Sequence, residues 1–400
     1  MDLRSHYPYW LLRHGIVNSY PSLHHDINTE VVIIGAGISG SLVAWYLCKA
    51  GFKVIIADRR HAGMGSTAAN TSLLQYEIDT PLYKLINLVG EKNAVRSYLL
   101  CKAAIYKLET ICRQLNDPSL FCTKPSFQFA SFKKDAARLQ KEYELRKKAG
   151  LSIRFLDEKS VLKIFGFHKP AGLLSEDGAE ADAYKITHLL LEKCITLGAH
   201  VYDHTEIKQI NYHKRGIVLA TADGKKIRAR YLVIACGYES QQYVPRVVQQ
   251  LHSTYAIVSE PFKQKNFWYK NSLIWETAMP YLYMRTTDDN RIIVGGKDIS
   301  SSDPFTRDKL LAAKARSLEA SFKKLFPSID FKTDFSWAGS FAFTKDGLPF
   351  IGTIPERPHT YFTLGFGGNG TTFSVIAAEI IRDILSGKTN NNAEIFSFNR

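Results

Sequence analysis

EVVIIGAGISGSLVAWYLCKAGFKVIIAD, residues 30–58, predicts a strand, a helix and a second strand in succession. Glu30–Ile34 is a short apolar, β-branched run that a glycine ends, as expected of a buried strand. Ile38–Ala50 has helical character, and Gly51 suits the position just after a helix. Lys53–Ala57 is the next apolar strand. This order is typical of the first unit of a doubly wound α/β domain.

The turn between the first strand and the helix contains a G-x-G-x-x-G motif. Gly35 permits the tight turn, Gly37 lets the backbone approach a pyrophosphate, and Gly40 lets the helix lie close to the strand. The free N–H groups and the dipole at the helix N-terminus, around Ile38 and Ser39, favour a negative charge. The motif in this context predicts a dinucleotide site.

Asp58 follows the second strand, 21 residues after Gly37. A carboxylate there can accept hydrogen bonds from ribose hydroxyls. It disfavours a 2′-phosphate on the ribose, although Arg59 and Arg60 weaken that argument. The motif alone does not distinguish NAD from FAD.

The rest of the chain predicts a second, different kind of sheet. Hydrophobic residues make up 45% of the 400 residues, enough for two domains. From Ser253 to Gly296 the chain is rich in Tyr, Ile and Val, with a predicted turn at Asp289-Asn290, which indicates antiparallel strands. Other expected helices are residues 91–115, 134–149, 184–197 and 372–385, and other expected strands are residues 200–210, 216–222, 225–229 and 231–235.

We therefore predict an α/β fold, α+β overall, in which a Rossmann-like nucleotide-binding domain adjoins a largely antiparallel second domain. The predicted nucleotide-binding domain is discontinuous and comprises residues 30–90, 150–245 and 335–400. Residues 91–149 and 246–334 are assigned to a substrate domain. Residues 1–29 form an N-terminal arm, expected to pack on the body of the protein rather than on a membrane.

The formal charge of +14 is compatible with anionic partners, but the basic residues are scattered. The densest run, residues 133–148, is interleaved with acids and is interpreted as a solvated helix face, which does not favour a nucleic-acid partner. The six cysteines form no C-x-x-C pair, and His200 and His204 lie on strand-like sequence, so no metal site is predicted. With neither a signal peptide nor a transmembrane segment expected, reduced thiols in the cytoplasm are predicted.

Four segments together resemble the D-amino-acid oxidase family of flavoproteins, in particular its glycine oxidase and sarcosine oxidase group. They are Val31–Asp58, the loop GSTAAN at residues 65–70, YLVIACG at residues 231–237, and the C-terminal motifs within residues 339–352 and 365–372, which contain TKDGLP and GFGGNG. Their order and spacing match the family over nearly the whole chain after residue 30.

The resemblance implies that FAD is the cofactor. The residues expected to bind it are Gly35, Gly37, Ile38, Ser39, Gly40, Asp58, Arg59, Ser66, Thr67, Ala235, Gly237, Gly339, Gly368, Asn369, Gly370, Thr371 and Thr372. Some relatives tether FAD through a cysteine at the position of Gly339, so non-covalent binding is expected here. Ile293 stands where relatives have a lysine that promotes reaction with oxygen. Oxygen and another electron acceptor therefore both stay open.

The family's reaction moves a hydride from a carbon beside nitrogen to the flavin, which implies an amine or amino-acid substrate. An arginine suits a substrate carboxylate, because its planar fork binds both oxygens. Arg285 is the first candidate, on the same strand face as Tyr283 by alternation. A surface ladder of side chains is the competing interpretation. Lys345 is the second candidate, or else a solvated loop lysine.

Three other functions stay open from the sequence. One is a flavin dehydrogenase of a hydroxy acid or polyol phosphate, and another is an NAD-dependent dehydrogenase. The third is a tRNA-modifying flavoprotein, since some such proteins carry this domain and the chain is basic.

Overall fold

The computed structural model describes residues 1–5 and 7–400 and contains the predicted strand–helix–strand unit. β1 (Ile27–Ile34) leads into α2 (Ile38–Lys49) and then β2 (Val54–Ala57). The two strands are parallel, with Ile34 paired to Ala57. Gly51 adopts φ +88°, as expected after a helix end.

This unit sits in the centre of a sheet that we call the nucleotide sheet. In the part of the chain that the structure describes, it has eight strands: β16 (Phe350–Gly352), β17 (Thr360–Leu364), β10 (Lys226–Ile234), β1, β2 and β7 (His200–Tyr202) in spatial order, with β9 (Gly216–Thr221) and β8 (Ile207–His213) attached beside β10. Strands β17, β10, β1, β2 and β7 are parallel. The sheet confirms the Rossmann-like prediction.

Two strands predicted separately are one. Residues 225–229 and 231–235 form the single strand β10, whose first half pairs with β9 and whose second half pairs with β17. Conversely, the predicted strand 200–210 is divided into β7 and β8. His204 adopts φ +45° at the break, a conformation that ends a strand.

The second sheet is largely antiparallel, as predicted. Among the described residues it has nine strands: β15 (Thr333–Phe343), β11 (Gln250–Ser259), β14 (Ile292–Ile299), β13 (Leu282–Thr286), β12 (Leu273–Glu276), β4 (Phe121–Phe129), β6 (Ala171–Ala181) and β3 (Leu73–Leu74) in spatial order, with β5 (Ile153–Asp157) beside β6. β12 and β4 pair in parallel.

Some strands and helices lie in a different part of the fold from the one expected for their predicted domain. β5, β6 and β15 fall in segments assigned to the nucleotide-binding domain, yet they pair in the second sheet. Conversely, α4 (Glu91–Gln114) falls in the predicted substrate domain but packs in the same core as α2. The chain therefore passes between the two sheets more often than the predicted domain segments indicate.

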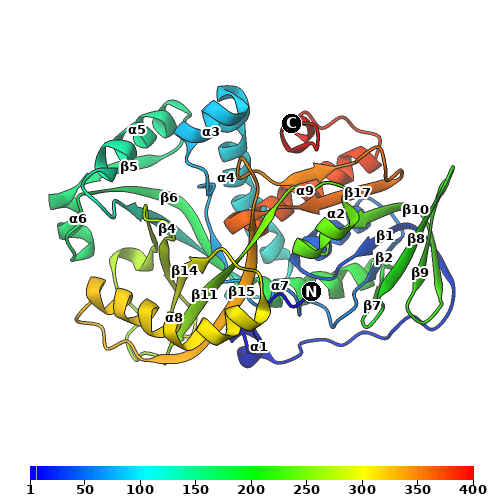
Figure 1. Cartoon of the computed structure of the whole chain (residues 1–400), viewed down its shortest axis with the longest axis horizontal. Coiled ribbons are helices and arrows are strands. Elements are labelled where there is room, and N and C mark those ends of the chain that lie inside the picture. The colour runs from blue at the N-terminus through cyan, green and yellow to red at the C-terminus, as the bar shows by residue number, and fades with distance from the viewer. Residues whose placement is uncertain (6) are drawn as a thin grey trace.

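Helices cover the sheets as Figure 1 shows. The remaining ones are α1 (Tyr9–His14), α3 (Leu82–Val89), α5 (Asp135–Lys148), α6 (Glu158–Phe165), α7 (Ala183–Thr196), α8 (Pro304–Leu325) and α9 (Gly370–Leu385). The predictions missed α8, which packs on β11, β14 and β15. Its signals were local: Asp303 accepts a hydrogen bond from Thr306 N (2.7 Å), and Pro304 occupies the first turn.

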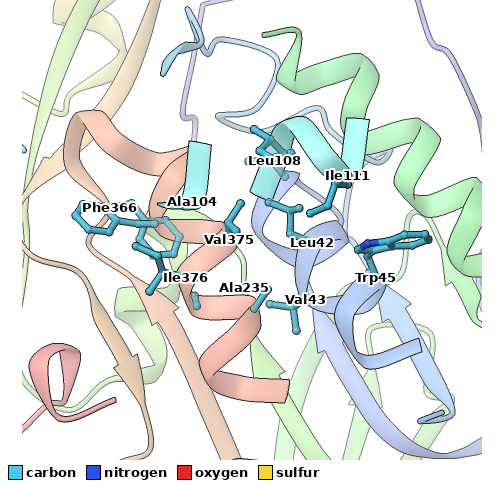
Figure 2. Close-up of a cluster of buried hydrophobic side chains, with 14 of the residues drawn as sticks. Leu42, Val43, Trp45, Ala104, Leu108, Ile111, Ala235, Phe366, Val375 and Ile376 are labelled. Atoms are coloured by element: carbon cyan, nitrogen blue, oxygen red, sulfur yellow. The ribbon is translucent and has the colours of Figure 1, made fainter. Parts of the chain in front are cut away.

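The largest core lies where α2, α4 and α9 meet (Figure 2). Leu42 and Val43 of α2 and Val375 and Ile376 of α9 are almost fully buried. α2 is apolar around nearly its whole circumference, because strands lie on one side of it and helices on the other. This packing holds the N-termini of α2 and α9 in fixed positions.

The N-terminal arm packs on the body of the protein, as expected. Trp10 is 1% exposed, and its Nε1 donates to the carbonyl of Asn70 (2.5 Å). Tyr9, Trp10 and Trp337 belong to one buried cluster with Ala68. The arm therefore holds the loop of residues 65–72 in place. Among the described residues no helix is long and apolar enough to cross a membrane.

We predict that Trp10→Ala lowers the free energy of unfolding by about 3–5 kcal/mol, the usual effect of removing a large buried aromatic side chain. Leu12→Ala on the same helix is the control, because Leu12 is 43% exposed; its effect should stay within about 0.5 kcal/mol. Urea denaturation followed by circular dichroism measures both. Equal effects of the two substitutions would contradict the account of the arm.

Candidate active site

A cavity of about 550 Å³ runs between the two sheets. One end, which we call the nucleotide end, is lined by Gly35, Gly37, Asp58, Arg59, Arg60 and residues 205–208. The other, the aromatic end, is lined by Gln75, Glu77, Asp79, Tyr238, Trp275, Tyr281, Tyr283 and Asp298. The loop 65–71 and residues 235–237, 339–341 and 365–370 line the middle.

The glycine turn depends on the absence of side chains. Gly35 has φ +109°, and a Cβ there would lie 2.6 Å from the carbonyl oxygen of Ala235. A Cβ on Gly40 would lie 1.8 Å from the carbonyl oxygen of Gly35. Gly37 leaves the cradle open, since a Cβ would meet only the hydroxyl of Thr67, at 2.9 Å. The backbone therefore forms a cradle that a phosphate group can approach closely.

The N-terminus of α2 opens into this cradle. Its N-cap is Gly37, which has no side chain to cap the helix. Thr67 Oγ1 accepts a hydrogen bond from Ile38 N (3.0 Å), which fastens the loop 65–71 to the helix start. A pyrophosphate at this point would face backbone donors and the positive end of the helix dipole. The cradle and the helix end fit a dinucleotide such as FAD.

Asp58 fixes the turn from the other side. Its Oδ2 accepts a hydrogen bond from Ala36 N (2.8 Å), and its Oδ1 accepts one from Arg60 N (2.9 Å). Burial raises the pKa of Asp58, an effect that these two backbone donors oppose. The carboxylate thus positions the glycine turn. Its expected contact with a ribose stays a prediction.

The sequence argument missed Glu239, which organises the cations at the nucleotide end. Its carboxylate forms ion pairs with Arg59 and with Arg60 (Nη2–Oε1, 3.0 Å). Leu3 also lines the cavity, because its carbonyl accepts from Ser340 N (2.8 Å) and so holds the arm beside β15. Glu239 lies two residues after the YLVIACG motif but outside it, and Leu3 lies in the N-terminal arm, so the motifs did not single out either residue.

The C-terminal glycine loop borders the aromatic end. Gly367 has φ +57°, and Gly368 N donates to Asp79 Oδ2 (2.8 Å). Asn369 Nδ2 donates to the carbonyl oxygens of Gln75 and Glu77 (both 2.9 Å). Asn369 therefore joins this loop to the chain segment that carries Glu77 and Asp79. The loop leads into α9, which begins at Gly370.

The structure brings most of the predicted cofactor residues to this cavity. Those that line it are Gly35, Gly37, Ile38, Ser39, Asp58, Arg59, Ser66, Thr67, Ala235, Gly237, Gly339, Gly368, Asn369 and Gly370. Gly40, Thr371 and Thr372 do not. Gly40 packs beneath the turn, and both threonines are buried in the first turn of α9, with the hydroxyl of Thr372 bonded to the carbonyl of Asn369 (2.8 Å).

Tyr281 and Tyr283 form one wall of the aromatic end, with ring centroids 5.7 Å apart. Tyr283 pairs with Gly295 across the neighbouring strand, and a Cβ on Gly295 would lie 2.3 Å from the Tyr283 ring. That glycine is what allows the ring to lie flat over the sheet. Burial raises the pKa of Tyr283 to about 12, so its hydroxyl stays protonated at neutral pH.

Three carboxylates share this end of the cavity. Glu77 and Asp79 come from the segment after β3, and Asp298 comes from β14. Burial raises the pKa of all three, that of Asp298 to about 6. The sequence argument did not identify them, because Asp298 lies far along the chain from Glu77 and Asp79 and none of the three belongs to a motif.

The expectation that Arg285 faces the cavity is not met. Its Nη1 donates to the carbonyl oxygens of Ser72 and Ala181 (both 2.9 Å), and its guanidinium lies over the ring of Trp10 (5.4 Å). Alternation placed it correctly on the strand face of Tyr283. It lies two residues further along that strand, however, where its side chain contacts the backbone at Ser72 and Ala181 instead of the cavity. Arg285 is 2% exposed and does not line the cavity.

Of three other predicted positions, Lys345 and Ile293 lie outside the cavity and Gly339 lines it. Lys345 is exposed in the loop after β15 and does not line the cavity, which agrees with the solvated alternative. Ile293 is fully buried in the cluster around Trp10. Gly339 does line the cavity, and a Cβ there would meet only Ala69, at 3.3 Å.

The family model for "FAD dependent oxidoreductase" (DAO) matches residues 30–384, which is most of the chain. The chain belongs to this DAO family of FAD-dependent oxidoreductases. FAD is therefore its cofactor, and the glycine cradle described above is where the DAO-family chain would hold the pyrophosphate. The predicted resemblance is confirmed.

The chain is similar to curated members of the DAO family over nearly its whole length. It is 25% identical to a glycine oxidase of Geobacillus kaustophilus over 378 residues, covering 90% of this chain and 93% of that protein. It is 22% identical to a D-amino acid dehydrogenase of Vibrio atlanticus over 413 residues, covering 90% of this chain and 97% of that protein.

Solved structures share the fold. The glycine oxidase of Geobacillus kaustophilus superposes with a TM-score of 0.78 at 19% identity, covering 91% of this chain and 96% of that one. The L-proline dehydrogenase of P. horikoshii also superposes with a TM-score of 0.78 at 19% identity, covering 93% of this chain and 97% of that one. At this identity the likeness supports the fold.

We predict that Gly35→Ala reduces FAD affinity at least about tenfold, because the methyl group would meet the backbone of Ala235. Gly51→Ala is the control: Gly51 also has a positive φ, yet nothing lies within 4 Å of its Cβ position. The ratio of bound flavin to protein, titrated by absorbance, measures both. Equal FAD content in the two variants would contradict the role of the cradle.

Proposed function

We propose that this chain oxidises the C–N bond of an amine or amino acid, with hydride transfer to a non-covalently bound flavin. The observation that supports the proposal most is the single cavity that joins the dinucleotide cradle to an end lined by Tyr281, Tyr283 and Trp275. The similar glycine oxidase and D-amino acid dehydrogenase act, by their names, on amino acids.

Bound FAD supplies the two-electron acceptor for such a reaction. The chain's own residues would position the substrate carbon and exclude water. The C–H bond of that carbon breaks, its electron pair and hydrogen leave as hydride, and the nitrogen lone pair forms a C=N bond. The nitrogen must be neutral at that moment, so positioning matters more than a strong base. Water then hydrolyses the imine.

Non-covalent binding is supported by the composition of the cavity wall. Gly339 has no thiol, and Cys236 is the cysteine that lines the described cavity. Cys236 Sγ lies 3.4 Å from Ser240 Oγ at the end of β10, and burial raises the pKa of its thiol to about 12. A protonated thiol is a poor nucleophile.

We also propose that oxygen is a poor electron acceptor for this enzyme. Among the described residues, the lysine that lines the cavity is Lys208, at the nucleotide end. The aromatic end has no lysine in the described chain, and Ile293 is buried away from it. A dehydrogenase that passes electrons to another acceptor fits this arrangement better than an oxidase.

We predict that the visible absorbance band of the bound flavin bleaches when an amine or amino acid is added under anaerobic conditions. Hydroxy acids and polyol phosphates are added as controls for the alternative reaction, oxidation of a C–O bond. Binding of tRNA, measured along a salt gradient, tests the alternative of a tRNA-modifying flavoprotein. Bleaching by a hydroxy acid or polyol phosphate alone would contradict oxidation at nitrogen.

We predict that the substrate-reduced enzyme re-oxidises slowly in air and rapidly with an artificial acceptor dye. Stopped-flow absorbance after mixing with aerated buffer measures the rate. Re-oxidation of the unmodified enzyme by oxygen as fast as by the dye would overturn the dehydrogenase proposal.

A further inference from the structure

We propose that the substrate is an amine that carries no carboxylate or phosphate group, and that its ammonium binds beside Glu77 and Asp298 at the aromatic end of the cavity. This inference rests on the proposed oxidation of a C–N bond and narrows its substrate class. Three independent features of the aromatic end support it: among the described residues no lysine or arginine lines it, it has unpaired carboxylate oxygens, and its walls are aromatic.

The first feature is the distribution of positive charge. The lysine and arginine side chains that line the described cavity are Arg59, Arg60 and Lys208, all at the nucleotide end. Arg285, the residue expected to bind a carboxylate, is buried outside the cavity. A substrate carboxylate or phosphate at the aromatic end would therefore meet carboxylates without a lining cation to neutralise it. Bringing like charges together in a partly desolvated site is unfavourable.

The second feature is an unused hydrogen-bonding capacity. Glu77 is 6% exposed, and its Oε2 has no hydrogen-bond partner among the described residues. Its Oε1 lies 3.5 Å from Arg146 Nη1, but that arginine also pairs with Glu142 (Nη2–Oε1, 2.8 Å). Glu142 occupies Nε and Nη2 of Arg146, which leaves Nη1 facing Glu77. Ser126 Oγ also donates to Glu77 Oε1 (3.4 Å), so Oε2 is the oxygen of Glu77 that has no donor among the described residues.

Asp298 also has an unpaired oxygen, although a side-chain hydrogen bond with Thr254 favours its charged form. Its Oδ1 has no partner within the described chain. Lys314 is near enough to favour its charge, yet Lys314 Nζ donates to the carbonyl of Lys297 (2.7 Å) and does not line the cavity. An ammonium group has three N–H donors and no acceptor. It would donate to these carboxylate oxygens, and one of the carboxylates would accept its proton before the hydride leaves, since the reacting nitrogen must then be neutral.

Asp79 adds a third negative group without a lining cation, although it is better satisfied. Its Oδ2 accepts from Gly368 N (2.8 Å), and the hydroxyl of Tyr281 also interacts with it. We assign Asp79 to holding the glycine loop. Its carboxyl group still adds to the acidic lining of this end of the cavity.

The third feature is the wall itself. Tyr281, Tyr283 and Trp275 line the cavity, and the Trp275 N–H is already directed at Ser126 Oγ (3.3 Å). Aromatic faces attract cations and accommodate the apolar chain of an amine. Rings and carboxylates together match an alkyl- or arylammonium ion rather than a zwitterionic amino acid.

Matched pairs of substrates test the inference in the FAD-loaded enzyme. Each pair consists of an amine and the amino acid that adds only an α-carboxylate: putrescine with L- and D-ornithine, and phenethylamine with L- and D-phenylalanine. We expect anaerobic flavin reduction to half-saturate at an amine concentration at least about tenfold below that of the amino acid, a difference of about 1.4 kcal/mol. Equal or tighter saturation by the amino acids would overturn the substrate class and leave C–N oxidation intact. Reduction by neither group would contradict the proposed function as well.

Asp298→Asn and Glu77→Gln test the two carboxylates. Each should raise the half-saturating amine concentration at least about tenfold and reduce the preference for the amine over the matched amino acid. FAD content should stay unchanged. Asp330→Asn, which removes the same charge from a side chain that is 80% exposed, should alter neither quantity.

The preference ratio separates binding from a structural role, because general destabilisation lowers FAD content and affects both members of a pair alike. Glu77 contacts the buried Arg146, so Glu77→Gln is also checked for thermal stability. If Glu77→Gln folds poorly, the result for Asp298→Asn decides the test. An unchanged preference ratio in Asp298→Asn would overturn the proposed ammonium site.

Discussion

The rest of the structure depends on the close approach of two backbones, where the turn after β1 meets the end of β10. Gly35 and Gly40 make this approach possible, because a side chain at either position would occupy the space of a neighbouring carbonyl group. The approach sets the direction of α2, and the α2–α4–α9 core then fixes that helix against α9. Both helix N-termini thereby border one cavity, at the edge of the sheet where doubly wound folds bind their ligands.

The two ends of that cavity differ in charge, although the chain as a whole carries +14. At the nucleotide end, arginines organised by Glu239 stand beside the dinucleotide cradle. At the aromatic end, carboxylates face tyrosine and tryptophan rings. Net charge therefore indicates little about the ligand, since the local arrangement of a few buried groups sets the potential that a substrate meets.

Much of the fold followed from local patterns. The strand–helix–strand unit and its glycines were predictable because each signal lies within 29 residues of chain. The acidic end of the cavity was not, since Glu77 and Asp298 lie far apart along the chain and line one cavity only in the folded protein. Arg285 shows the limit of alternation, which gives the face of a strand but not the distance along it at which a cavity ends. Helix α8 was missed although Asp303 and Pro304 carried ordinary start signals.

The most direct test of the central claim is a chromophore assay on the purified protein. The protein is denatured by heat or acid, precipitated, and the flavin in the supernatant is identified and quantified against the protein. The account predicts a yellow protein that releases FAD into the supernatant, approaching one molecule per chain. A colourless protein that cannot be reconstituted with FAD would contradict the cofactor assignment, and a flavin that stays with the precipitate would contradict non-covalent binding.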